Sequence, residues 1–325
     1  MGMCISNHIG ESIEMGNGLD MPTLPLVVER REKYSFPFGD AEVVQLALPE
    51  TFIVYGDLLF KERQLNFRSS DRSDMVELNF CLLGRGQVYN QLTQQTHIVR
   101  PMVHNILYTS ALDGGGKFDT ESPYRFIEIH FTRKYFLHLV QDCGGLLAKF
   151  ADKIAQNKYT ELFEQNMPID LEMEQCLHDI MYCPYSGSLK LLFLQSKCVE
   201  LLVRQAESIK KYVQKSSLKS AYDRECICQA RDYLVEHTAK PPTIPELAKI
   251  AGINEFKLKK GFKELFNNSI HGFLRDYRLN RAKEKLLQSD LPIKTIVEES
   301  GYATVQHFST AFKKKFGMSP GKLKN

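Results

Sequence analysis

The sequence predicts an α+β protein that has a β-rich N-terminal domain and an all-helical C-terminal domain. Between residues 43 and 132, short runs rich in Val, Ile, Phe, Tyr and Thr alternate with turn residues, which is typical of a sandwich or small barrel. From Arg133 onward the apolar residues follow a helical period instead. The last hundred residues contain one pattern twice, which indicates a structural duplication. A chain of 325 residues is long enough for two domains with separate cores.

The first 40 residues are rich in Gly, Met, Pro and charge, and we expect an irregular leader over residues 1–40. Because no basic region precedes an apolar stretch there, we expect no secretory signal. The strands predicted next are Thr51–Phe60, Met75–Leu83, Gln87–Leu92, His97–Arg100, Ile106–Thr109 and Tyr124–Thr132. The predicted turns between them include Gly84-Arg85-Gly86 and Asp113-Gly114-Gly115-Gly116.

Four helical stretches follow the strands and complete the domain that we predict over residues 41–215. They are Tyr135–Gln141, Gly145–Ile154, Leu171–Met181 and Ser188–Lys215. The spacing of apolar residues in the last stretch fits a helix packed on a barrel and fits a dimer seam equally well. The sequence therefore leaves both alternatives open. The polar residues 216–222 are predicted to form an interdomain linker before a domain over residues 223–325.

The duplicated pattern predicts two helix-turn-helix units that share one scaffold. Its copies place Leu258, Phe262 and Phe266, and then Phe308, Phe312 and Phe316, on buried stripes with four-residue spacing. In the first unit, Thr243 with Glu246 predicts a capping box, Gly252 a tight turn, and Asn254 the N-cap of the second helix. A helical pattern over Ile270–Gln288 joins the units. Its 19 residues span roughly 28 Å, close to the ~34 Å of one DNA turn.

The face opposite each stripe carries the residues that we predict to contact DNA. In the first copy these are Phe256, Lys257, Lys259, Lys260 and Lys263, and in the second Gln306, Ser309, Thr310 and Lys313. Lysines can donate to guanine or to phosphates, Gln to adenine, and Ser or Thr to either kind of base. A solvated lysine face is the alternative. We expect the first copy to dominate affinity, and His307 to be a packed ring.

Charge separates the two domains. Residues 223–325 contain 19 Lys and Arg against 12 Asp and Glu, a net charge of +7, whereas the other 222 residues carry −4. A basic C-terminal domain indicates a polyanionic partner for that part of the chain. Arg275, Arg278 and Arg281 on the connecting helix are candidates either for phosphate contacts or for salt bridges within the domain, and we favour the salt bridges.

Metal chemistry and catalysis are not expected. Eight cysteines lack a framework spacing, and neither Cys226-x-Cys228 nor Cys176 with Cys183 has a matching second pair. A cupin-type enzyme would need clustered histidines, but His97, His104 and His130 are isolated in the sequence. We therefore predict no enzyme activity, no metal and no cofactor. No run approaches eighteen apolar residues, so we also expect no membrane span and a cytoplasmic protein with reduced thiols.

Residues 223–325 resemble the AraC/XylS family of bacterial transcription regulators. The matching segments include Ile244-Pro-Glu-Leu-Ala-Lys-Ile-Ala-Gly252, Arg278-Leu279-x-x-Ala282-x-x-x-Leu286-Leu287, Pro292-Ile293-x-x-Ile296-x-x-x-x-Gly301-Tyr302, Phe308-Ser309-x-Ala311-Phe312-Lys313 and Phe316-Gly317-Met318-Ser319-Pro320. The resemblance implies a seven-helix domain whose base-contacting positions fall on Phe256, Lys259, Lys260, Gln306, Ser309 and Thr310. Two departures are Ala303, where the family usually has a capping Ser, and Gly261 inside a recognition helix. Thr304 can supply the missing cap.

Cys183-Pro-Tyr-x-Gly187 and the following Lys190-Leu-Leu-Phe-Leu-x-x-Lys197-x-x-Glu200-Leu-Leu are similar to the subgroup that includes the pyochelin-siderophore regulator. That similarity implies a cupin-like sensing barrel, helices used for dimerisation, and a ferric siderophore as inducer. The resulting hypothesis is a ligand-responsive activator that binds double-stranded promoter DNA as a homodimer and contacts RNA polymerase. The alternative is a DNA-binding regulator whose N-terminal domain only dimerises.

Overall fold

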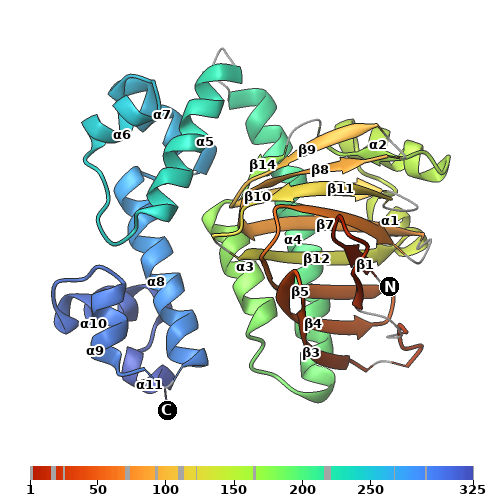
Figure 1. Cartoon of the computed structure of the whole chain (residues 1–325), viewed down its shortest axis with the longest axis horizontal. Coiled ribbons are helices and arrows are strands. Elements are labelled where there is room, and N and C mark those ends of the chain that lie inside the picture. Colours follow the sequence, from red (N-terminus) through yellow and green to blue (C-terminus); the bar gives the residue numbers. More distant parts are fainter. Residues whose placement is uncertain are drawn as a thin grey trace. The chain divides into compact units, whose positions relative to one another are not determined.

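The computed structural model describes residues 3–15, 20–24, 26–69, 74–91, 94–108, 113–121, 123–163, 166–215, 221–266, 268–289 and 291–324. These residues form two compact units, Met1–Lys211 and Tyr212–Asn325. The first contains two β-sheets and helices, and the second is helical in its described residues (Figure 1). The predicted α+β class, with a β-rich N-terminal part and an all-helical C-terminal part, is confirmed.

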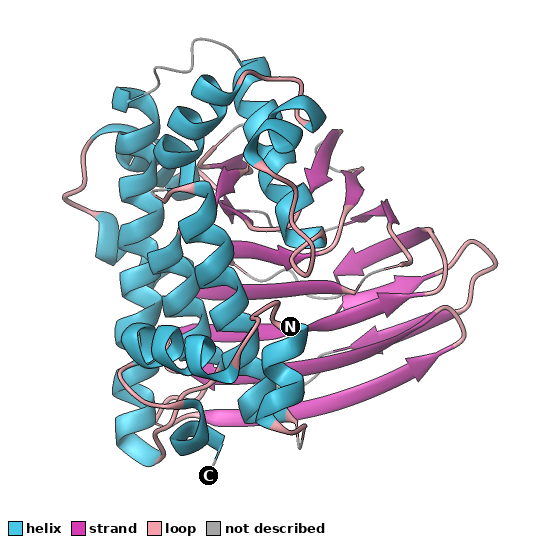
Figure 2. Ribbon diagram, turned by 90° about the vertical axis from the view of Figure 1, so that its left-hand side faces the viewer, coloured by secondary structure: helices cyan, strands magenta, loops and turns pink. Residues whose placement is uncertain are grey.

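The larger sheet of the first unit has eight strands. Along it the order is β13 (Thr160–Glu161), β10 (Val103–Tyr108), β7 (Met75–Leu83), β12 (Tyr124–Thr132), β5 (Thr51–Phe60), β4 (Gly39–Leu48) and β3 (Val28–Phe36), and β14 (Met167–Pro168) also pairs with β10. All its pairs are antiparallel. Figure 2 shows these long strands side by side. The predictions for β5, β7 and β12 match their bounds, while Leu92 and Thr109 lie outside the described residues.

A second, six-stranded sheet packs against one face of the first. Its order is β2 (Ser12–Met15), β1 (Met3–Ser6), β6 (Gln64–Ser69), β11 (Asp113–Phe118), β8 (Gly86–Asn90) and β9 (Gln95–Val99). One apolar cluster joins both sheets, with Ile5, Leu65 and Phe67 from the smaller and Val43 and Phe126 from the larger. The face of the larger sheet that carries Phe126 is therefore directed toward the smaller sheet, and we call it the inner face.

Two sequence predictions for this unit are wrong. Residues 1–40 are not an irregular leader, because they include β1, β2 and β3. Strand β3 alternates half-buried and exposed residues at the end of the sheet, and an edge strand tolerates the charged composition that hid it. The Gly114-Gly115-Gly116 segment is not a turn but part of β11. A Cβ on Gly114 would lie 1.8 Å from the Tyr89 carbonyl oxygen, so glycine permits this close strand approach.

Helices complete the first unit on the other face of the larger sheet. They are α1 (Arg133–Val140), α2 (Gly145–Ala155), α3 (Leu171–Met181) and α4 (Gly187–Lys215). The α4 side chain of Gln205 donates to the carbonyl oxygen of Asn105 at 3.0 Å and contacts His104 Nδ1 at 3.1 Å. On α3, the Met181 carbonyl accepts from Tyr55 at 3.2 Å. These bonds fix α3 and α4 to the sheet.

The second unit contains seven helices within the described residues, in agreement with the expected number. They are α5 (Ala221–Glu236), α6 (Ile244–Ile250), α7 (Glu255–Phe266), α8 (Ile270–Gln288), α9 (Ile293–Glu299), α10 (Val305–Phe316) and α11 (Pro320–Lys324). Of the predicted linker, residues 216–220 lie outside the described residues, and Ala221 and Tyr222 begin α5. The unit has two separate apolar clusters, one around each helix-turn-helix.

Candidate nucleic-acid interface and the inner face of the β-rich unit

The first helix-turn-helix consists of α6 and α7, and its turn follows from local chemistry. Thr243 and Glu246 form the predicted capping box at the start of α6. Gly252 adopts φ of +68° between the helices, a conformation that costs glycine little. The Asn254 side chain then accepts from the backbone N–H of Lys257 at 2.8 Å and caps α7. The three local predictions for this turn are confirmed.

The second helix-turn-helix, α9 and α10, repeats this arrangement with different residues. Gly301 has φ of +70° at the position that corresponds to Gly252. Thr304 is the N-cap of α10, and its hydroxyl accepts from the His307 backbone N–H at 3.2 Å. The cap therefore lies one residue after Ala303, as expected from the sequence. His307 itself is exposed, so the prediction of a packed ring is wrong; at the third position of α10, its ring lies on the solvent side.

Helix α8 is the common support of both units. Phe273 and Tyr277, in its N-terminal half, pack with Leu258, Phe262 and Phe266 of α7. In its C-terminal half, Leu279, Ala282 and Leu286 pack with Phe308 and Phe312 of α10. The predicted stripes are therefore buried, except that Phe316 is only partly buried. Because one continuous helix carries both cores, it holds the two recognition helices in a fixed relation within this unit.

All five residues predicted on α7 are exposed. Phe256 has 74% of its surface exposed. Such high exposure is unusual for a large aromatic side chain and is typical of a residue that contacts a binding partner. Lys259 pairs with Glu255 at 3.1 Å on the same helix. Because such a surface ion pair is weak, Lys259 can leave Glu255 and bind another anion. Lys257 differs, because its ammonium group lies 3.0 Å from the carboxylate of the buried Asp223 of α5. Lys257 therefore also ties the recognition helix to the start of the unit.

The second recognition helix presents a less charged face. Gln306, Thr310 and Lys313 are exposed and Ser309 is half-buried. The Thr310 hydroxyl donates to the Gln306 carbonyl oxygen at 3.0 Å, so it is engaged within its own helix. Lys314 is a further exposed cation of the last turn and was not among the predicted residues. The nine predicted residues therefore lie on two outward faces of one unit.

The arginines of α8 have different roles. Arg275 pairs with Asp276 and Arg281 with Glu284, as the salt-bridge alternative predicted. Arg278 instead donates from Nε to the Thr238 carbonyl at 2.9 Å and from Nη1 to the Gly301 carbonyl at 3.4 Å. Burial lowers the pKa of Arg278 below its ordinary value, and the nearby Tyr302 opposes this shift. Arg278 thus links the loop after α5 to the turn of the second helix-turn-helix, a role that sequence spacing did not reveal.

In the β-rich unit, a group of polar side chains lies on the inner face of the larger sheet. Glu128 and His130 of β12 alternate with Ile127 and Ile129, so they share the face of Phe126. Across the strand pair, Glu128 is opposite Asn79 and His130 is opposite Glu77. Asn79 donates to Glu77 at 2.8 Å, and His130 Nε2 lies 3.3 Å from Glu128 Oε2. The strand register therefore brings together residues that are about fifty positions apart.

This environment changes the acidity of the group. Burial raises the pKa of Glu77 to about 7, and the nearby Glu128 carboxylate adds to this rise. Burial alone raises the pKa of Glu128 to about 7. Burial also lowers the pKa of His130 below its ordinary value. Within the described residues, Glu77, Glu128 and His130 are the one group whose donor atoms are placed to hold a metal ion.

A second polar group extends the same face toward the edge of the sheet. Asn105 donates to Glu161 at 3.2 Å, and His97 Nε2 lies 3.2 Å from the same carboxylate. Tyr159 also donates to Glu161, and burial with this bond raises the Tyr159 pKa. Neither group was predicted, because the sequence contains no His-x-His to mark it. The sequence signal that could have indicated the first group is an acidic residue two positions before Asn or His within an apolar strand, as in Glu77-x-Asn79 and Glu128-x-His130.

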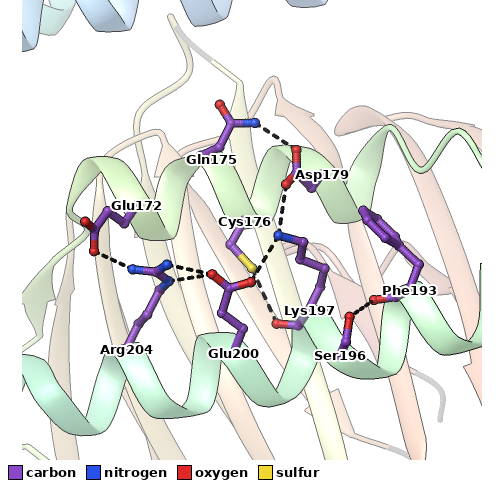
Figure 3. Close-up of polar contacts among 9 residues, drawn as sticks. All are labelled: Glu172, Gln175, Cys176, Asp179, Phe193, Ser196, Lys197, Glu200 and Arg204. Carbon is purple, nitrogen blue, oxygen red and sulfur yellow. Dashed lines mark hydrogen bonds and ion pairs between the residues drawn. The ribbon is translucent and has the colours of Figure 1, made fainter. Parts of the chain in front are cut away.

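Helices α3 and α4 are joined by a network of charged side chains (Figure 3). Lys197 of α4 lies 3.1 Å from Asp179 of α3 and 3.0 Å from Glu200, and Arg204 bonds Glu200 and Glu172. The thiol of Cys176 donates to the Lys197 carbonyl at 3.4 Å. Because these contacts orient α4, one of its faces is buried against the unit and another stays exposed.

The two faces of α4 bear on the two alternatives that the sequence left open. The buried face includes Leu191, Leu194, Cys198, Leu201 and Leu202. The exposed face carries Leu189 at 64%, Leu192 at 62% and Val203 at 52% exposure. Their spacing of three, then eleven, keeps them on one side of a helix. The helix therefore contributes to the core and in addition offers an apolar stripe, which we call the α4 stripe.

Two features together define a class of protein: a pair of helix-turn-helix units on one connecting helix, preceded by a β-rich unit. Residues 247–325 match the family model of a helix-turn-helix domain of AraC type, and residues 52–220 match that of the regulatory protein PchR N-terminal domain. The second match spans about half of the chain. The chain belongs to the family of AraC-type regulators with this N-terminal domain.

Several known proteins are similar to parts of this chain. The regulatory protein PchR of Pseudomonas aeruginosa is 31% identical over 126 residues, 38% of this chain and 42% of that protein. The xylose operon regulatory protein of Haemophilus influenzae is 31% identical over 94 residues, 29% of this chain and 24% of that protein. The solved C-terminal domain of AraT, a response regulator of Geobacillus stearothermophilus, is 33% identical, covers 30% of this chain and 83% of that one, and has a TM-score of 0.29. The chain thus matches less than half the length of these curated relatives.

Proposed function

We propose that this chain binds double-stranded promoter DNA through the outward faces of α7 and α10 and thereby regulates transcription. The observation that carries the proposal is that all nine predicted residues lie on two recognition helices whose opposite faces are buried on the shared α8. An α-helix that is anchored on one side and polar on the other fits the major groove. The basic charge of this part of the chain supports a polyanionic partner.

Within this interface, α7 makes the stronger contribution. It exposes Lys259, Lys260 and Lys263, whereas Gln306, Ser309 and Thr310 of α10 are neutral. A well-formed base contact contributes about 1–3 kcal/mol of discrimination. Lys260→Ala should therefore weaken binding roughly 5–150-fold, and more than Lys313→Ala does. Lys257 is a less suitable test, because its replacement would also break the ion pair with Asp223.

The experiment is a fluorescence-anisotropy titration of the full chain with the duplex that genomic footprinting identifies. Lys149→Ala is a matched control, since Lys149 is an exposed helical lysine of the other unit. We expect the control to bind as the unmodified chain does, and affinity to fall steeply with salt as phosphate contacts release counterions. A flat salt profile, or equal losses for Lys260, Lys313 and Lys149, would refute the proposal.

We further propose that the chain forms a homodimer through the α4 stripe. A second copy can cover this exposed apolar face, in the way that a coiled-coil seam buries such residues. Leu192→Glu should shift the chain toward the monomer in analytical ultracentrifugation. Gln195→Glu, a charge change on a neighbouring side of α4, should leave the oligomeric state unchanged. Dimers that persist in Leu192→Glu would place the interface elsewhere.

The regulator is proposed to act as an activator in the cytoplasm that contacts RNA polymerase and responds to a small molecule, with a ferric siderophore as the first effector to test. The family of the N-terminal unit supports this choice. No helix in the described residues has the length and apolarity needed to cross a bilayer. Binding of candidate ferric siderophores to the full chain, measured by fluorescence quenching, tests the effector. If the DNA affinity stays unchanged with every effector that binds, the second candidate is favoured, a regulator whose N-terminal unit only dimerises.

A further inference from the structure

Three potential metal ligands converge on the inner face of the larger sheet. Glu77 belongs to β7, and Glu128 and His130 belong to β12. One donor atom from each lies within 4.8 Å of the others. The contact between His130 Nε2 and Glu128 Oε2 is 3.3 Å. Two ligands that lie about 2.1 Å from one ion at a right angle are about 3.0 Å apart, so this spacing needs only a small adjustment to accept an ion.

The position of the group is set by the backbone. His130 faces Glu77 and Glu128 faces Asn79 in the antiparallel register, so the four side chains form a compact square on one face. Ligands on paired strands of a central sheet are held more rigidly than ligands on loops. His130 is 4% exposed, and the Glu128 side chain is 18% exposed. The group is therefore largely shielded but not sealed from solvent.

Among the described residues, no Lys or Arg is paired with the Glu77 or Glu128 carboxylate. In the described part of the chain, the recorded partners of the two carboxylates are Asn79, His130 and each other. Two half-buried carboxylates that lie close together are costly when both are ionised, because they lose part of their hydration and repel each other. A divalent cation between them would neutralise both charges.

We propose that Glu77, Glu128 and His130 bind one divalent first-row transition-metal ion, such as Mn²⁺, Fe²⁺ or Zn²⁺. The imidazole favours these ions over Mg²⁺ and Ca²⁺, which prefer oxygen ligands alone, and the carboxylates suit the harder ions of the row. Asn79 acts as a positioning residue: it donates to Glu77 at 2.8 Å and contacts Glu128 at 3.5 Å. Such outer hydrogen bonds orient ligating carboxylates. Three protein ligands leave coordination positions open for water or a small molecule.

This site belongs to the β-rich unit and does not depend on whether the chain binds DNA. It also differs from the effector hypothesis, since the ion is bound by protein side chains and needs no carrier molecule. The direct test is metal binding by the full chain, purified without an oligohistidine tag and stripped with a chelator. Each metal salt is titrated alone by isothermal calorimetry, and the metal retained after desalting is measured by mass spectrometry.

We expect one tightly held ion per chain for at least one of Mn²⁺, Fe²⁺ and Zn²⁺, and none for Mg²⁺. Glu77→Gln, Glu128→Gln and His130→Gln should each weaken binding more than about tenfold. Glu161→Gln is the matched control, because Glu161 is a carboxylate on the same sheet that contacts His97 and Asn105. This control should retain the ion.

Three results would overturn the site: no ion bound by the unmodified chain, full binding by Glu128→Gln, or equal loss in Glu161→Gln. Circular dichroism identifies any variant that fails to fold. In that case X-ray absorption of the metal-loaded unmodified chain decides, since the site requires one imidazole among oxygen ligands. A coordination shell that contains sulfur, or one without imidazole, contradicts the assignment.

Discussion

The turns of the two helix-turn-helix units allow a matched test of how α8 couples them. Gly252 and Gly301 have nearly the same backbone conformation, with φ of +68° and +70°. Alanine in this left-handed region costs about 1–2 kcal/mol at either position. The surroundings differ, however. A Cβ on Gly252 would meet the exposed Tyr222 hydroxyl at 3.3 Å, whereas a Cβ on Gly301 would lie 2.8 Å from Arg278 Nη2 and 2.9 Å from its Cζ.

The difference gives a magnitude for each substitution. In Gly252→Ala the end of the Tyr222 side chain can move, so the cost stays near the backbone value. In Gly301→Ala the guanidinium must move, which weakens its bonds to the Thr238 and Gly301 carbonyls. A hydrogen bond that involves a charged group contributes about 1.5–3 kcal/mol. We therefore expect Gly301→Ala to destabilise the second helix-turn-helix by about 2 kcal/mol more than Gly252→Ala destabilises the first.

Hydrogen exchange measured by mass spectrometry can follow the amides of α6–α7 and α9–α10 separately in the full chain. The decisive comparison repeats both alanine substitutions in an Arg278→Ala background, where the obstruction at Gly301 is absent. There the two substitutions should have equal cost. If they already cost the same with Arg278 present, or if the difference persists without it, the coupling through Arg278 is wrong.

Three further outcomes are expected in the same unit. Asp232→Ala should lower stability by about 3–5 kcal/mol in urea unfolding followed by circular dichroism, because it removes the carboxylate that lies 2.7 Å from the fully buried Arg231 guanidinium; a loss below 1 kcal/mol would contradict this. Thr304→Ala should cost about 1 kcal/mol by removing the cap of α10, and a similar loss in Ala303→Gly alone would argue against Thr304 as the cap. Hydrogen bonds from the Thr243 backbone and hydroxyl lower the pKa of Glu246 below its ordinary value of 4.5. The ionised Glu246 side chain therefore stabilises α6 above pH 4.5, and this stabilisation is lost as the pH falls through the lowered pKa of the folded state. The protection factors of the α6 amides against hydrogen exchange, measured between about pH 3 and 6, should fall toward low pH. Glu246→Gln should abolish this fall.

The helical unit was largely predictable because its structure is local. Periodic apolar residues, caps and turn glycines all act within a few positions of each other. Thr243, Gly252, Asn254 and Thr304 accordingly have the roles that their sequence neighbours indicate. The outward faces of α7 and α10 followed from the same period, since the side opposite a buried stripe must be exposed.

The β-rich unit was predictable only in part. Its central strands β7 and β12 alternate apolar and polar residues over part of their length, and β5 begins with a run of buried residues, so all three are recognisable as strands. The edge strand β3 and the glycine-rich β11 do not alternate apolar and polar residues in that way. They form strands because they pair with neighbouring strands, β3 with β4 and β11 with β6 and β8. The local sequence does not reveal this pairing. This is why the N-terminal residues were mistaken for a leader and residues 114–116 for a turn.

The sequence by itself determined the family, the duplicated helix-turn-helix and the residues on its two outward faces, because each rests on spacing within one helix or one turn. Only the tertiary structure decided which polar groups meet. It placed Glu77 beside His130 through the register of β7 and β12, joined Arg278 to the turn at Gly301, and gave α4 both a buried and an exposed apolar face. Contacts between distant segments depend on strand register and helix packing, and these are fixed by the whole core rather than by any short stretch of the chain.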